Sequence, residues 1–390
     1  MSLSEHGFMD VTLAEDYHNI CEVVPQAREI ARLGQPQTIQ GQPWRFLQRS
    51  LAEPGTHVGW YLAELFREGT YGKIYRAYRM IVQRRADGLF DVTSSPTEVV
   101  VKQTEPPTGA SQLPAEDVQA HVSEALLHVL AWQTLQKTVV PRGVPRPYEV
   151  FGDGDGAGAW KSMSLCMSYV RGRTLYSFFG KHWQPETKTA NARLLAEILA
   201  QLAYILFHLQ HQLQLNHRDV KVNNILVSRH PRDPKLLVLP GGAASVKTDY
   251  ELVLIDFGFA CVGCPPPRVP NTVFQAGSWF PLGELCCKSG RDIAQLLFCI
   301  HCYFPLDAFL PTDIVTEIRR WLTVTIGTVT IDMLHGFTKE GRPRRAGASG
   351  HPEFHTGIYE FLRRGDVDPA ACAPTAVFNF CSNYLSASAI

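Results

Sequence analysis

The sequence lacks an excess of charge of either sign. Its 390 residues include 37 Lys and Arg and 37 Asp and Glu, so the formal net charge is zero. Nucleic acids and anionic membrane surfaces attract proteins that carry an excess of positive charge. We therefore expect neither a nucleic acid nor an anionic membrane as the main partner.

A secretion signal and a membrane-spanning segment are missing as well. The first six residues are polar and do not form the cationic stretch and apolar core of a signal peptide. The most apolar stretch, residues 194–215, contains Glu197, several Gln and two His, and its apolar residues recur at helical spacing. We therefore predict a buried amphipathic helix there, no membrane span and an intracellular location.

Ten cysteines are present. Because no secretion signal is visible, we expect their thiols to be reduced. Cys261 and Cys264, and likewise Cys299 and Cys302, have the spacing of zinc ligands. However, Cys299 and Cys302 lie in a continuous apolar run, which favours packing in a core helix over a metal site.

The composition is that of a globular protein, with 45% apolar and 19% charged residues. Residues 1–57 carry no catalytic motif and form an N-terminal extension. Residues 58–101 have the pattern of successive strands, and residues 117–137 that of a helix. This order predicts an antiparallel sheet with a helix on one side.

Later segments add two strands within residues 141–169 and a mostly helical part after Gly172. Residues 229–250 interrupt this part with Pro, Gly and polar residues. We predict that they form an exposed, mobile loop.

Two short segments carry the chemistry. Residues 217–224 read HRDVKVNN and residues 256–258 read DFG, and each adjoins a strand-like apolar segment. Phosphoryl transfer from ATP requires groups that orient a hydroxyl, neutralise a phosphate and bind magnesium, because positioning and charge stabilise its transition state. The two segments supply these groups, namely Asp219, Lys221, Asn224 and Asp256.

On these motifs the chain resembles the eukaryotic-type protein kinases, over about residues 60–310. The resemblance implies an α+β, two-lobed, protein-kinase-like fold. Residues 58–167 would form a small lobe of antiparallel sheet and one helix. Residues 168–390 would form a larger, mainly helical lobe with an insertion at about 229–250, and ATP would bind between the lobes.

The resemblance also implies roles for the motif residues. Asp219 accepts the proton of the substrate hydroxyl or orients it, Lys221 neutralises the γ-phosphate, and Asn224 and Asp256 bind Mg²⁺. Lysine two positions after the catalytic aspartate is typical of kinases that phosphorylate Ser or Thr in protein substrates. His217 and Arg218 are expected to be structural, and Arg218 would be free to hold a phosphorylated activation segment.

Residues 68–75 look like the glycine-rich loop that covers the phosphates of ATP, with Gly69, Gly72 and Ile74 at motif positions and Arg67 in place of the first glycine. Lys102 ends a VVVK strand and is expected to hold phosphates and to pair with a helix glutamate. Apolar residues at helical spacing favour Glu124 for this role. Glu116 is the alternative, but it lies near the helix start, where it would serve the helix dipole.

Residues 165–172 resemble the hinge between the lobes, where Met167, Tyr169 and Val170 would lie beside the adenine. Asp292 resembles the buried aspartate that anchors the catalytic loop. In contrast, residues 259–283 contain no A-P-E motif, so the substrate platform is unusual. Reduced platforms of this kind occur in divergent kinases, including those of large DNA viruses, for which the location would be the host cell or the virion.

Two other functions are open. Small-molecule phosphotransferases share the fold, but they usually lack the lysine after the catalytic aspartate and a full D-F-G. A scaffold could keep the kinase shape and bind partners through residues 1–57 and 229–250. The retention of every catalytic group favours an active protein kinase over both.

Overall fold

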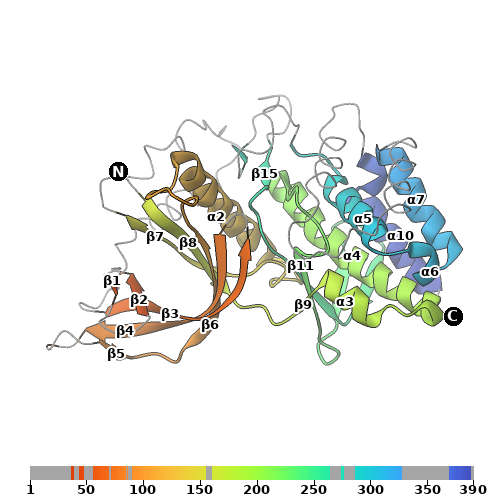
Figure 1. The fold of residues 1–390 in the computed structure, drawn as a ribbon. Coiled ribbons are helices and arrows are strands. Elements are labelled where there is room, and N and C mark those ends of the chain that lie inside the picture. Colours follow the sequence, from red (N-terminus) through yellow and green to blue (C-terminus); the bar gives the residue numbers. More distant parts are fainter. Residues whose placement is uncertain are drawn as a thin grey trace. The chain divides into compact units, whose positions relative to one another are not determined.

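The computed structural model describes residues 37–38, 44–47, 56–69, 72–84, 86, 90–154, 160–263, 274–275, 286–326 and 369–387. By its internal contacts the chain divides into two units (Figure 1). The first contains the described residues up to Trp132 and Pro145–Val170. The second contains Gln133–Val144 and the described residues from Arg171 onward. Most of the predicted extension at residues 1–57 lies outside the described residues.

A curled antiparallel sheet forms the body of the first unit (Figure 1). In the described part of the chain its strand order is β1-β2-β3-β4-β6-β8-β7, and β5 pairs with β4. The strands are β1 (Gln37–Thr38), β2 (Trp44–Leu47), β3 (Thr56–Gly69), β4 (Gly72–Arg84), β5 (Phe90–Val92), β6 (Thr97–Thr104), β7 (Pro147–Gly154) and β8 (Trp160–Ser168).

Alternating burial explains why these segments are strands. On β6 the side chains of Val99 and Val101 are buried, and the residues between them are only partly buried. Successive side chains of a strand point to opposite faces, so this pattern places one face of β6 in the core. Trp60 of β3 and Cys166 of β8 complete the same core cluster. The strands predicted within residues 58–101 are confirmed.

Helix α2 (Ala115–Leu135) is the helix expected beside the sheet. Its last turn belongs to the second unit, together with the segment up to Val144. The reason is local packing, because Gly143 lies against the side chains of Leu135 and Ile205, and its carbonyl accepts a hydrogen bond from the Leu254 N–H (2.8 Å). The sequence-based boundaries had placed this segment in the small lobe.

Helices dominate the second unit. Helix α4 (Lys188–Leu213) is mostly buried and packs against α10 (Pro374–Ala387) and α5 (Arg291–Tyr303). The other described helices are α3 (Leu175–His182), η3 (Pro185–Thr187), α6 (Leu306–Phe309), α7 (Thr312–Ile326) and η4 (Pro369–Cys372).

Short strands connect the helices of this unit in antiparallel pairs. β11 (Ile225–Arg229) lies between β14 (Tyr250–Leu254) and β9 (Arg173–Thr174). β15 (Cys261–Val262) lies between β10 (Leu215–Asn216) and β16 (Phe274–Gln275). The overall class is therefore α+β, with an antiparallel sheet and several helices.

One helix of the described residues, Pro185–Leu213, is long and apolar enough to cross a bilayer by composition. Most of its apolar window is buried inside the protein. The buried helix predicted for residues 194–215 is thus confirmed.

The prediction that residues 229–250 form a loop is wrong. The segment forms a β-hairpin of β12 (Lys235–Val238) and β13 (Ser245–Thr248). Leu237 and Val246 are buried, while Leu236 is 58% exposed. The hairpin packs on α4 and α10, and Ser382 of α10 donates a hydrogen bond to the Ser245 carbonyl (2.9 Å). The burial of alternate residues in its strands outweighs the Pro and Gly residues that suggested a loop.

The expectation of reduced thiols is also wrong at one pair, because Cys261 and Cys286 form a disulfide. Gly263 passes so close to Cys286 that an added Cβ would lie 1.8 Å from the Cys286 carbonyl oxygen. This close approach brings together cysteines that are 25 residues apart in sequence. Cys264 lies outside the described residues, and Cys299 is buried in α5 as expected for a core helix.

Candidate active site

The loop at residues 217–224 connects β10 to β11 and is anchored by a buried carboxylate. Asp292, in the first turn of α5, accepts hydrogen bonds from the N–H groups of His217 (2.9 Å) and Arg218 (2.8 Å). Asp292 has no exposed surface, so these bonds compensate the loss of its hydration. The anchoring role predicted for Asp292 is confirmed.

Asn216 fixes the entry to the same loop, and no local sequence pattern marks it for this role. Its side chain accepts a hydrogen bond from the Lys288 N–H (2.6 Å) and donates one to the Lys288 carbonyl (3.0 Å). It also donates to Asp292 (3.2 Å). The segment before α5 is thereby joined to the start of the loop, which limits how far either can move alone.

Three predicted site residues meet within this loop. The Lys221 ammonium lies 2.7 Å from Oδ2 of Asp219, and Nδ2 of Asn224 donates to the same oxygen at 2.7 Å. Asn224 also donates to the Asp219 carbonyl (3.0 Å). The carboxylate therefore has a defined orientation, and Oδ1 of Asn224 is the oxygen with which this amide could bind a cation.

Asp256 follows β14, which pairs with β11 so that Leu254 lies opposite Ile225. The Ile255 N–H donates to the Asn224 carbonyl at 3.0 Å. Asn224 and Asp256 therefore stand at adjoining ends of two paired strands. Asp256 has a φ of 69°, an uncommon conformation for a residue other than glycine.

His217 and Phe257 pack together behind this region. Their ring centroids are 4.7 Å apart, and both side chains are fully buried. Burial lowers the pKa of His217, although the charges of Asp292, Asp219 and Asp256 oppose it. A neutral His217 matches its contacts, because Nδ1 accepts from the Asp219 N–H (3.3 Å) and Nε2 lies 3.1 Å from the Ile255 carbonyl.

Arg218 was expected to be free to hold a phosphorylated segment. Its side chain is instead fully buried in this structure, and its φ is 63°. This burial agrees with the structural role expected for Arg218, whereas the expectation that its side chain is free is not met; its role toward a phosphorylated segment stays a prediction.

The first unit contains the predicted lysine–glutamate pair. Nζ of Lys102 lies 2.6 Å from Oε1 of Glu124, and only 14% and 8% of the two side chains are exposed. Glu116 is exposed in the first turn of α2, where an acidic residue favours the helix dipole. The choice of Glu124 as the partner is confirmed.

The residues around Lys102 are set by strand register. Ile74 of β4 and Leu165 of β8 lie directly opposite Lys102 on either side. Met167 lies opposite Val100, and this pair is two residues along the strands from the pair of Lys102 and Leu165. The predicted nucleotide-contacting side chains Ile74 and Met167 are thus brought beside Lys102, and both are half-buried.

The hairpin of β3 and β4 closes at Gly69 and Gly72. Gly72 has a φ of 121°, and an added Cβ would lie 1.9 Å from the Gln103 carbonyl oxygen. Packing against β6 therefore requires glycine at position 72, whether or not a phosphate binds there. Thr70 and Tyr71, between the two glycines, lie outside the described residues.

The predicted hinge residues continue β8. The Tyr169 N–H donates to the Glu98 carbonyl (3.4 Å), and the Tyr169 ring lies 6.0 Å from that of Phe66. Tyr169 and Val170 are half-buried. Val170 is the last residue of this part of the first unit, so the division between the units falls within the predicted hinge.

His121 is a neighbour of the Lys102–Glu124 pair that the sequence analysis missed. It lies one helical turn before Glu124 on α2, and its Nδ1 is 3.1 Å from Oγ1 of Thr104. Burial, together with the charge of Lys102, lowers its pKa to about 3. The spacing of three residues from Glu124 was visible in the sequence, but the burial that makes His121 neutral was not.

The described residues include no cluster of three or more His, Cys, Asp and Glu side chains that could hold a metal ion. Any cation at Asn224 and Asp256 would therefore need ligands from water or substrate as well. No family model and no curated protein matches the chain. The interpretation of the site rests on its own geometry and on the motifs.

Proposed function

We propose that the protein is an ATP- and Mg²⁺-dependent protein kinase that transfers the γ-phosphate to Ser and Thr hydroxyls of proteins. The observation that carries the proposal is the cluster of Asp219, Lys221 and Asn224, on a loop whose backbone is held by Asp292. In the proposal this cluster belongs to a two-lobed kinase fold, with the first unit as the small lobe.

Asp219 is the group that would meet the acceptor. Its carboxylate is held by two donors at 2.7 Å, so it is positioned before a substrate arrives. A positioned carboxylate orients a hydroxyl and accepts its proton as the phosphoryl group moves. The Lys221 ammonium lies beside this carboxylate and would neutralise charge on the transferred group.

The donor set fits magnesium. Mg²⁺ prefers oxygen ligands, binds through one or two carboxylates and keeps several waters. Asp256 would supply the carboxylate and Asn224 the amide oxygen, and the metal would neutralise charge on the phosphates. The absence of a larger acidic cluster in the described residues is consistent with such a site.

Lys102 would hold the phosphates of ATP. Its 2.6 Å pair with Glu124 fixes the ammonium at a defined place in the first unit. The resemblance places the nucleotide against the surrounding residues, which are Gly69, Gly72, Ile74, Met167, Tyr169 and Val170.

The acceptor class follows from Lys221. A lysine two residues after the catalytic aspartate, together with a complete D-F-G, favours a protein kinase over a small-molecule phosphotransferase. A scaffold without catalysis has no use for the charged contacts around Asp219.

The proposal is tested with purified protein, MgATP and a peptide library, with phosphosites identified by mass spectrometry. We expect phosphate on Ser and Thr, and we expect Asp256→Asn to abolish the magnesium-dependent transfer because the variant loses a full ligand charge. Phosphate found only on a small molecule would favour the phosphotransferase. A protein that neither binds MgATP nor transfers phosphate would favour the scaffold.

A further inference from the structure

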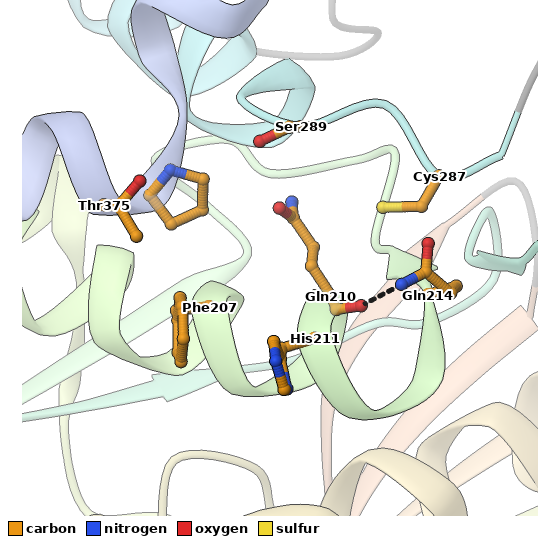
Figure 2. A pocket seen from close by; sticks show the side chains of 8 residues that line it. Phe207, Gln210, His211, Gln214, Cys287, Ser289 and Thr375 are labelled. Atoms are coloured by element: carbon orange, nitrogen blue, oxygen red, sulfur yellow. Dashed lines mark hydrogen bonds between the residues drawn. The ribbon is translucent and has the colours of Figure 1, made fainter. Parts of the chain in front are cut away.

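A pocket of about 240 Å³ lies within the second unit, between α4, the segment before α5 and the start of α10. We call it the α4–α10 pocket. None of the predicted catalytic residues lines it, and Figure 2 shows its labelled side chains converging from these three segments. Its lining residues are Phe207, Gln210, His211, Gln214, Cys287, Ser289, Pro374 and Thr375.

Gln210 has an unused donor at this pocket. The residue is only 9% exposed, and its Nε2 has no hydrogen-bond partner among the residues that the structure describes. Figure 2 shows the side chain extending from α4 toward Ser289, into the space between the three segments. A buried donor without a partner is unfavourable, so a ligand that accepts its hydrogen bond would be stabilised.

The start of α10 supplies further donors. Val377 makes the first backbone bond of the helix, to the Ala373 carbonyl at 3.0 Å. The N–H groups before it, including that of Thr375, have no partner within the helix, and the helix dipole makes this end positive. The hydroxyl groups of Thr375 and Ser289 also line the pocket.

The lining determines which anion fits. The described lining residues include no Asp or Glu to repel a negative charge, and no Lys or Arg to neutralise a doubly charged one. A helix N-terminus favours phosphate and carboxylate alike, but a carboxylate carries a single charge and therefore depends less on an Arg or Lys partner than a doubly charged phosphate does. One wall is aromatic, because the Phe207 ring stacks on the His211 ring with centroids 5.4 Å apart and an interplanar angle of 18°.

We propose that the α4–α10 pocket binds a small organic carboxylate. The carboxylate accepts hydrogen bonds from Gln210, Thr375 and Ser289, and the apolar part of the ligand packs against Phe207. The volume suits a molecule smaller than most drugs, whose sites are about 300–1,000 Å³. The site is independent of the proposed phosphoryl transfer.

The test uses benzoate as the probe, with benzamide as its neutral counterpart and inorganic phosphate as the doubly charged anion. Binding is measured by NMR titration of the full chain, following the Thr375 amide and the Gln210 side-chain amide. We expect benzoate alone to shift both signals in a saturable way. Equal binding of benzamide, preferential binding of phosphate, or no saturable shift with benzoate would overturn the proposal.

Variants locate the site. Gln210→Leu keeps the approximate size but loses the donor, so we expect benzoate affinity to fall about tenfold or more. Gln210→Leu should not lower the melting temperature, because it removes an unpaired buried amide. Gln212→Ala, on the exposed side of the same helix, is the matched control and should bind like the wild type.

Thr375→Val provides a second test of the site that does not depend on a substitution at the buried Gln210. It removes an exposed hydroxyl and should also weaken benzoate binding. Unchanged affinity in both Gln210→Leu and Thr375→Val would exclude this pocket as the carboxylate site.

Discussion

The histidine beside the lysine–glutamate pair should make the first unit sensitive to acid. His121 is buried next to Lys102, and its pKa is lowered to about 3. An unfolded chain binds a proton at this histidine below its ordinary pKa of about 6.5, while the folded protein does not until the pH is near 3. Stability from this group is therefore complete above pH ~6.5 and is lost progressively as the pH falls toward 3.

The size of the effect follows from proton linkage. One proton bound only by the unfolded state lowers the free energy of unfolding by about 1.4 kcal/mol for each pH unit. Between pH ~8 and ~5 the contribution of His121 is then about 2 kcal/mol. A loss of this size is a large part of the 5–15 kcal/mol that typically stabilises a domain, so about 2 kcal/mol should be measurable.

The assay is urea unfolding at several pH values between 8 and 5, for the wild type and for His121→Gln. Glutamine keeps a polar contact for Thr104 but does not titrate in this range. We expect the free energy of unfolding to fall less steeply with acid in the variant, by about 2 kcal/mol over this interval. Parallel pH dependences would show that His121 is not the buried neutral group described here.

Three further predictions concern other parts of the chain. Lys102→Met and Glu124→Gln should each lower kcat strongly, and the double variant should lose less than their sum; fully additive losses would mean that the pair does not act as a unit. Leu237→Ala should destabilise the protein by about 3 kcal/mol in urea unfolding because the side chain is buried, whereas Leu236→Ala, 58% exposed on the same strand, should cost little; equal effects would contradict the packing of the hairpin. Reduction of the Cys261–Cys286 disulfide, which joins residues 25 apart, should lower the free energy of unfolding by about 3.5 kcal/mol, and Cys286→Ser should abolish the difference between reduced and oxidised protein. A wild type that unfolds alike with and without reductant would argue against the bond.

Local patterns predicted much of the fold. The run of β-branched residues in β6 and the helical spacing of apolar residues in α4 are local features, so both elements could be identified from sequence. The Lys102–Glu124 pair was also predictable, because helical spacing selects Glu124 over Glu116. Interactions across the chain were less accessible.

The misses share one physical cause, which is that tertiary contacts decided them. Asn216 bonds to Lys288, which is 72 residues away, and no local pattern marks that contact. Cys261 pairs with Cys286 because the backbone at Gly263 passes close by, whereas the sequence showed only the zinc-ligand spacing of Cys261 and Cys264 and no secretion signal. The hairpin at residues 229–250 was hidden because Pro and Gly residues surround its short apolar strand.

The central claim, that Asp219 is the catalytic carboxylate of a kinase, is tested most directly by comparing two aspartates with the same local pairing. Asp219 and Lys221 lie 2.7 Å apart, and Asp233 and Lys235 form an exposed pair at 2.6 Å with the same spacing. We predict that Asp219→Asn lowers transfer to Ser and Thr by about 10²–10⁴-fold, with ATP affinity retained in calorimetry, and that Asp233→Asn changes neither. Transfer at the wild-type rate in Asp219→Asn would contradict the account.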